Sequence, residues 1–134
     1  MPSRKEIIDS IERAPYSALL GLRIESASDG TAVVRMPFKQ ALLNDGGPQA
    51  PLHGGAIASL IDVTACAAVW SMEATTRSAT ISMTVNYTGM AFQSDLVAHA
   101  KVRRHGKRVA SLTVDVRDAA DALVADALVT YKIS

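Results

Sequence analysis

The longest hydrophobic stretch of the chain covers residues 56–72, where nearly every residue is small or apolar. A stretch without a polar face is typical of a helix that is buried on all sides, so we predict a central core helix here. Asp62 is the only charged residue within it. Because burying a lone carboxylate is unfavourable, we expect Asp62 to be paired or to face a cleft. His53, Gly54 and Gly55 directly precede the stretch, and we expect a flexible connection whose backbone N–H groups point along the helix axis.

A helix pattern and a β-hairpin pattern come before the central helix. Ser3, followed three residues later by Glu6, forms a capping box, and the apolar stripe after it predicts a first helix to about Arg13. Residues 22–26 and 31–36 alternate in polarity, and the Asp29-Gly30 pair between them predicts a β-hairpin. Residues 16–21 indicate a turn or a short helical piece, and residues 37–51 indicate a long loop with three prolines and two glycines. Loops of this length in a compact domain are usually functional.

Four strand-like stretches follow the central helix. They cover residues 79–87, 95–104, 109–118 and 123–133, and turn residues separate them. In the third stretch Leu112, Val114 and Val116 alternate with polar residues, which is typical of a half-buried antiparallel strand. We therefore predict an α+β fold in which an antiparallel meander curves around one long helix. Residues 1–134 are expected to form one domain, because the length suits a single core and no linker or repeat interrupts it.

Composition and charge exclude several classes of protein. The chain is 49% hydrophobic and 20% charged with a net charge of +1, so it lacks the basic surface of a nucleic-acid-binding protein. One cysteine, Cys66, allows no intrachain disulfide or multi-cysteine metal site, and three scattered histidines have no ligand spacing. The first residues lack the apolar run of a signal peptide, and Asp62 argues against a membrane span. We expect a cytoplasmic protein without a bound metal.

One motif is more specific than the strands. His53-Gly54-Gly55 is followed by Leu60-x-Asp62, and with the order of elements it resembles the hotdog-fold acyl-CoA thioesterases, most closely the phenylacetate-pathway (PaaI-type) branch. The resemblance implies a hotdog fold and a site in which Asp62 is the nucleophile or general base. It also implies that the Gly54 amide, with help from Gly55, polarises the thioester carbonyl. In this family the sites lie between subunits, which implies a homodimer or homotetramer. The implied hydrolysis needs no cofactor besides the coenzyme A of the substrate.

Two positions depart from the family pattern. Cys66 stands four residues after Asp62, where the family often has Ser or Thr to position water. Gly47 stands where many relatives have Asn or Gln, so Asn44 or Gln49 becomes the candidate for contact with the carbonyl. His53 is more plausible as a residue that orders the loop than as a base. Cys66 is a poor candidate nucleophile, because a thiol in an apolar helix stays protonated.

A basic turn follows the second of the four strand-like stretches, residues 95–104. It consists of Arg103, Arg104, Lys107 and Arg108 around His105-Gly106. It is either a solvated hairpin tip or a docking site for the phosphates of coenzyme A, which require Lys or Arg. Arg77, Ser78 and Thr80 are further candidates for contact with the pantetheine arm.

The residues and the resemblance together favour hydrolysis of an acyl-CoA to a carboxylic acid and free coenzyme A. Thioester hydrolysis needs a base or nucleophile and donors aimed at the developing oxyanion, and Asp62 and Gly54 supply them. Two alternatives remain: a non-catalytic domain that binds acyl-CoA or lipid, and an enoyl-CoA hydratase or dehydratase that uses a histidine with an acidic residue. The aliphatic composition suits a medium or branched acyl chain.

Overall fold

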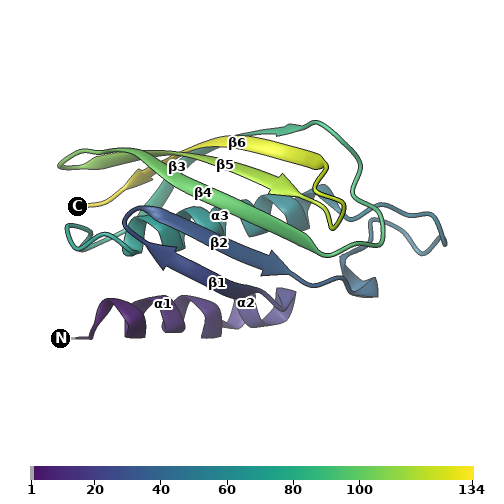
Figure 1. The fold of residues 1–134 in the computed structure, drawn as a ribbon, viewed down its shortest axis with the longest axis horizontal. Coiled ribbons are helices and arrows are strands. Elements are labelled where there is room, and N and C mark those ends of the chain that lie inside the picture. Colours follow the sequence, from purple (N-terminus) through teal and green to yellow (C-terminus); the bar gives the residue numbers. More distant parts are fainter. Residues whose placement is uncertain (1) are drawn as a thin grey trace.

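The structure is a computed structural model that describes residues 2–134. Two helices come first, then a hairpin, a long loop with one 3-10 turn, a long helix and four strands (Figure 1). The elements are α1 (Arg4–Arg13), α2 (Pro15–Leu20), β1 (Arg23–Ser28), β2 (Thr31–Met36), η1 (Gln40–Leu42), α3 (Gly54–Trp70), β3 (Ala79–Tyr87), β4 (Leu96–His105), β5 (Val109–Arg117) and β6 (Leu123–Lys132). The fold is α+β, with α3 along one face of an antiparallel sheet, as the sequence predicts.

The early elements form for local reasons that the sequence shows. The Ser3 hydroxyl accepts a hydrogen bond from the Glu6 N–H at the start of α1, which satisfies one of the unpaired amides at a helix N-terminus. Asp29 and Gly30 both have positive φ, at 51° and 82°, as the tight turn between β1 and β2 requires. The capping box and the hairpin are therefore confirmed.

The helix α3 begins two residues earlier than its hydrophobic pattern predicts. Gly54 is its first residue, and His53 caps it by accepting the Gly55 N–H. The expectation of a flexible glycine connection before the helix is therefore wrong. The glycines are part of the first turn because His53 accepts the Gly55 N–H with its side chain and the Ala56 and Ile57 N–H groups with its carbonyl.

The order of the strands differs from the predicted meander. The sheet has six strands in the order β1-β2-β4-β5-β6-β3, so of the four strands after α3 only β4, β5 and β6 follow one another as neighbours. The chain leaves β3 and crosses to β4, while β3 itself pairs with β6. Alternation of polarity identifies which face of a strand is buried, but it does not identify the neighbouring strand. Within residues 2–134, β3 has no partner on its outer side, which makes it an edge strand.

The helix α3 is buried on most of its surface but not on all of it. The sheet and α1 cover Ile57, Leu60, Ile61 and their neighbours, whereas a strip that includes Asp62 and Cys66 is only half-buried. The prediction of burial on all sides is wrong for this strip, because the sheet covers only one side of the helix and α1 and α2 cover only part of the other. No helix within the described residues is long and apolar enough to cross a membrane.

Candidate active site

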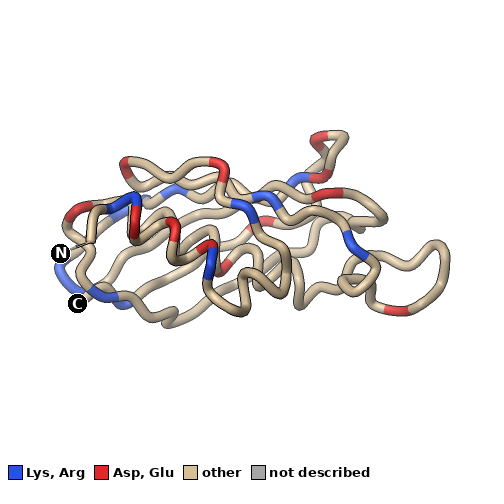
Figure 2. The backbone as a smooth tube through the Cα atoms, turned by 90° about the horizontal axis from the view of Figure 1, so that it is seen from below, with Lys and Arg blue, Asp and Glu red and all other residues tan. Residues whose placement is uncertain are grey.

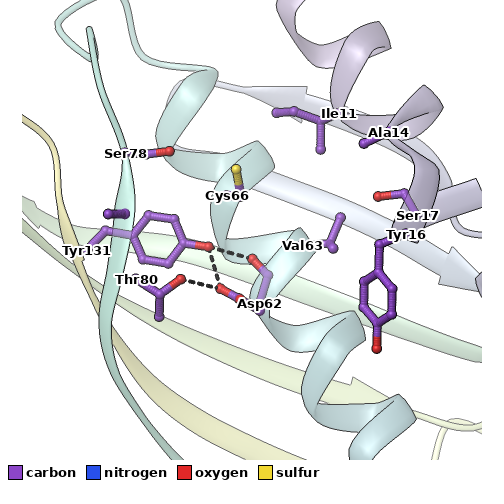
Figure 3. Close-up of a pocket in the computed structure, with 11 residues that line it drawn as sticks. Ile11, Ala14, Tyr16, Ser17, Asp62, Val63, Cys66, Ser78, Thr80 and Tyr131 are labelled. Atoms are coloured by element: carbon purple, nitrogen blue, oxygen red, sulfur yellow. Dashed lines mark hydrogen bonds between the residues drawn. The ribbon is translucent and has the colours of Figure 1, made fainter.

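A cavity of about 360 Å³ opens beside the half-buried strip of α3 (Figure 3). The α1–α2 region forms one wall, and β3 with the end of β6 forms the other. Most of its surface is apolar, and Asp62 is its only charged lining residue. The lining residues are Ile11, Ala14, Tyr16, Ser17, Asp62, Val63, Cys66, Ser78, Ala79, Thr80 and Tyr131.

The Asp62 carboxylate is held by two hydroxyl groups from the sheet. The Tyr131 hydroxyl lies 2.5 Å from Asp62 Oδ1 and 2.7 Å from the Asp62 carbonyl oxygen. The Thr80 hydroxyl donates to the same Oδ1 over 2.8 Å. Oδ2 accepts no hydrogen bond from residues 2–134. The lone charge of α3 is therefore both paired and placed at a cleft, as its sequence context predicts.

Cys66 lies one turn further along α3 in the same cavity. Burial raises the pKa of its thiol to about 11. Since the thiolate is the nucleophilic form, this thiol is unreactive near neutral pH. Burial also raises the pKa of Tyr131, and the adjacent Cys66 and Asp62 raise it further. Both groups therefore keep their protons near neutral pH.

The N-terminus of α3 presents one glycine amide rather than two. His53 Nδ1 accepts the Gly55 N–H over 2.8 Å. A side chain at Gly55 would place its Cβ 2.9 Å from that nitrogen, so the cap needs glycine there. The Gly54 N–H makes no hydrogen bond with residues 2–134, while the Gly54 carbonyl accepts from the Tyr87 hydroxyl over 2.8 Å. Gly54 is therefore the better donor for a ligand, and the amide of Gly55 is already engaged.

The structure does not bring Gly54 and Asp62 together within one chain. Eight residues separate them on a straight helix, which corresponds to about 12 Å along the axis. Gly54 does not line the cavity that contains Asp62. Asn44 is exposed at the Gly54 end of α3, where its N–H bonds to the carbonyl of Pro51. The predicted catalytic residues therefore form two groups. His53, Gly54 and Gly55 lie at the N-terminus of α3, and Asp62 lies in its middle.

The candidate coenzyme A contacts lie near the chain terminus. Arg77 and Ser78 line a small hollow with Lys132, and Ser78 also lines the Asp62 cavity. Arg104 and Lys107 are exposed at the turn between β4 and β5. Figure 2 shows Lys and Arg segments beside the C-terminus. Within the described part of the chain, none of these four cations forms an ion pair with a carboxylate.

Sequence reasoning missed Tyr131 and Lys132. A signal for Tyr131 existed: it stands at an inward position of a strand in an aliphatic core, where its hydroxyl needs a buried partner. Asp62 is the one charged residue of the helix that packs there. For Lys132 the sequence offers no signal, because its neighbour Arg77 is 55 residues away along the chain and only the β3–β6 pairing makes them adjacent. In residues 2–134 no group of three or more His, Cys, Asp or Glu side chains is arranged to hold a metal ion.

Comparison with known proteins identifies the family. A profile described as the thioesterase superfamily matches residues 51–125, which include Gly54, Asp62 and Cys66. The chain belongs to the thioesterase superfamily. Superfamily proteins with the hotdog fold typically bind coenzyme A substrates and form oligomers.

Three relatives of this thioesterase-superfamily chain illustrate the similarity. A Halobacterium salinarum protein provisionally named an esterase is 36% identical over 107 residues, which cover 78% of this chain and 70% of the relative. The structure of the conserved protein PA5202 from Pseudomonas aeruginosa has a TM-score of 0.83 at 34% identity, covering 92% of this chain and 96% of its own. The structure of the E. coli PaaI protein has a TM-score of 0.79 at 26% identity, covering 96% of this chain and 92% of its own. The predicted hotdog fold of PaaI type is confirmed.

Replacing His53 tests its role as the cap of α3. We expect His53→Ala to lower the free energy of unfolding by about 0.5–2 kcal/mol, because the Gly55 amide loses its acceptor. His53→Asn is the matched control, since asparagine is a preferred capping residue and retains most of the stability. Urea unfolding of the three proteins at one protein concentration measures the difference. An unfolding free energy of His53→Ala equal to that of the unmodified protein would show that the cap is unimportant.

Proposed function

We propose that this protein is an acyl-CoA thioesterase that converts an acyl-CoA and water into a carboxylic acid and coenzyme A. The observation that carries the proposal is the arrangement of Asp62. Its carboxylate is oriented by Thr80 and Tyr131 in a mostly apolar cavity, on the same helix as the Gly54 amide. Superfamily membership supports a thioester hydrolase, and the residue roles below are our proposal.

In the proposed reaction Asp62 starts the attack on the thioester carbonyl. Either it takes a proton from water, whose oxygen then bonds to the carbonyl carbon, or it attacks that carbon itself and water later hydrolyses the anhydride. Both routes form an oxyanion, which the Gly54 N–H stabilises at the positive end of the α3 dipole. The C–S bond then breaks, and the sulfur leaves as the thiol of coenzyme A after protonation. The reaction needs no metal or redox cofactor.

We further propose that the complete site combines two chains. Within one chain about 12 Å of helix separates the two groups, too far for both to contact one thioester. The outer edge of β3 has unused backbone hydrogen-bonding groups, which favours pairing with another strand. Ile81 and Tyr87 on this strand are 55% and 52% exposed, so a strand paired there would also cover large apolar side chains. A two-fold dimer through this surface would bring Gly54 of one chain toward Asp62 of the other.

The remaining parts of the substrate are assigned by chemistry. The apolar walls formed by Ile11, Ala14 and Val63 suit an aliphatic acyl group. Arg77 and Lys132 lie next to Ser78 at the border of the same cavity, where they suit the phosphates of coenzyme A. Arg104 and Lys107 at the neighbouring turn are a second set of cations for these phosphates.

Replacing Asp62 with Asn tests the central role. We expect Asp62→Asn to lower kcat for thiol release from acyl-CoAs by about 10³-fold or more, because the amide is neither a base nor a nucleophile. The fold is retained, since an amide oxygen still accepts from Thr80 and Tyr131. Thiol release is measured across short, medium, long and aromatic acyl-CoAs, with circular dichroism as the control.

Three results would contradict this assignment. Unchanged thiol release by Asp62→Asn would remove Asp62 from the reaction. Tight calorimetric binding of acyl-CoA without turnover by the unmodified protein would favour the non-catalytic binding domain. Loss of the conjugated absorbance of a 2-enoyl-CoA, without thiol release, would favour the hydratase.

Mixed dimers test the composite site. Gly54→Pro removes the amide donor while suiting the structure, because proline is favoured in the first turn of a helix and His53 already has ψ 134°, as a residue before proline requires. Gly54→Ala is the control that keeps the N–H, and its Cβ makes only ordinary contact with Tyr87, at 3.4 Å. We expect Gly54→Pro to lower kcat about 10²-fold or more and Gly54→Ala to have a far smaller effect.

The two inactive variants should complement each other. In a dimer of one Asp62→Asn chain and one Gly54→Pro chain, a shared site leaves one of two sites intact. Mixed dimers isolated with two affinity tags should therefore regain about half of the activity of the unmodified dimer. If both groups acted within one chain, each chain would carry one defect and the mixed dimer would stay inactive.

Charge removal at the cavity border tests coenzyme A docking. We expect Arg77→Ala to raise KM for acyl-CoA about two- to fivefold, the range of an exposed ion pair, with little change in kcat. Added salt should reduce the difference. The matched substrate is the corresponding acyl-pantetheine, which lacks the nucleotide phosphates and should be insensitive to the substitution. An equal effect on both substrates would place Arg77 elsewhere in the reaction. Lys107→Ala, measured in the same way, tests whether the turn between β4 and β5 binds these phosphates.

A further inference from the structure

We propose that Tyr131 and Thr80 are positioning residues that hold Asp62 through Oδ1 and so make Oδ2 the reacting oxygen. This inference rests on the proposed function, since it concerns the same carboxylate. It assigns a role to two residues of the sheet, one on β6 and one on β3, that contact Asp62 from outside α3.

Both donors converge on one oxygen of the carboxylate. Thr80 and Tyr131 are directly paired across the β3–β6 ladder, and both hydroxyls contact Oδ1, at 2.8 Å and 2.5 Å (Figure 3). An aspartate on a half-buried strip of a helix would otherwise rotate among several side-chain conformers. Two contacts to the same atom remove that freedom and make the two carboxylate oxygens different from each other.

Tyr131 also ties the backbone of α3 to the sheet. Its hydroxyl lies 2.7 Å from the carbonyl oxygen of Asp62, so it contacts the main chain and the side chain of the same residue. Tyr131 is only 3% exposed, and its ring is therefore fixed by packing. Burial raises the pKa of Tyr131, which keeps the hydroxyl protonated and able to donate when Asp62 is ionised.

The contact with Oδ1 goes beyond what burial of the tyrosine requires. A buried phenol has one proton to donate, and the Asp62 carbonyl alone would be a sufficient acceptor. The shorter distance is nevertheless the one to the carboxylate. A hydrogen bond to an ionised group is shorter and stronger than one to a neutral group. The geometry therefore serves the carboxylate as well as the tyrosine.

This arrangement has a chemical consequence for Oδ2. With Oδ1 held by two donors, the carboxylate keeps one orientation, and Oδ2 therefore keeps one position at the cavity. Attack on a carbonyl requires the reacting atoms to be close and aligned, and a misplacement of about 1 Å can lower the rate about 10²-fold without weakening substrate binding. A positioning role therefore predicts an effect on kcat rather than on KM.

Thr80 provides the cleaner pair of variants, because it is exposed and its side chain does not support the core. Thr80→Val has nearly the same shape but lacks the hydroxyl, whereas Thr80→Ser keeps the hydroxyl and lacks the methyl. We expect Thr80→Val to lower kcat about tenfold with KM within about twofold, and Thr80→Ser to retain most of kcat. Tyr131→Phe, which removes the second donor, should lower kcat by a similar or larger factor.

Combination with Asp62→Asn separates positioning from other effects. If Thr80 and Tyr131 act through the carboxylate, Thr80→Val and Tyr131→Phe cause no further loss in the residual rate of Asp62→Asn. A full additional loss in that background would overturn the inference. So would an unchanged kcat in Thr80→Val, or an equal loss in Thr80→Val and Thr80→Ser, since the hydroxyl would then be irrelevant.

The outcomes also distinguish this inference from the proposed function. An active Asp62→Asn protein would overturn the proposed function. An inactive Asp62→Asn protein together with fully active Thr80→Val would leave the function in place and overturn only the positioning role. If Tyr131→Phe fails to fold, the comparison of Thr80→Val with Thr80→Ser decides the question by itself.

Discussion

The interaction between the Asp62 carboxylate and the two sheet hydroxyls is the constraint around which the protein is arranged. A carboxylate on an apolar core helix is stable only where donors reach it or water does. Thr80 and Tyr131 provide the donors from β3 and β6, and the cavity provides the opening. The sheet must therefore place β3 beside β6 and leave one strip of α3 half-covered. The strand order and the incomplete burial of the helix both satisfy this requirement.

The helix α3 also determines how far apart the proposed chemical groups lie. Its 17 residues hold the Gly54 amide at one end and Asp62 in the middle, and a straight helix cannot bring them closer. Single-chain chemistry would need a loop to bend one group toward the other. Instead, His53 and Tyr87 hold the first turn in place through Gly55 and the Gly54 carbonyl. A rigid helix with its groups apart, beside an edge strand with exposed apolar residues, is consistent with a site that two chains complete.

Periodicity predicted much of the fold, because it depends on local physics. The apolar stretch located α3, the alternation of Leu112, Val114 and Val116 located β5, and the Asp29-Gly30 pair located the first hairpin. Among the predictions that were wrong, one concerned strand order and one concerned a helix start. The meander was wrong because alternation is blind to strand order, and the start of α3 was placed too late because glycine is a poor helix former without its cap.

The candidate site divides in the same way. That Asp62 is a lone charge on an apolar helix and that glycines precede it can be predicted without the structure, since both follow from adjacent residues. The contacts of Tyr131 and Thr80 with the carboxylate, and the position of Lys132 beside Arg77, became visible only in the folded chain. The physical reason is that these contacts join residues from separate elements. Their meeting depends on the register of β3 against β6 and on the packing of α3, which no local pattern encodes.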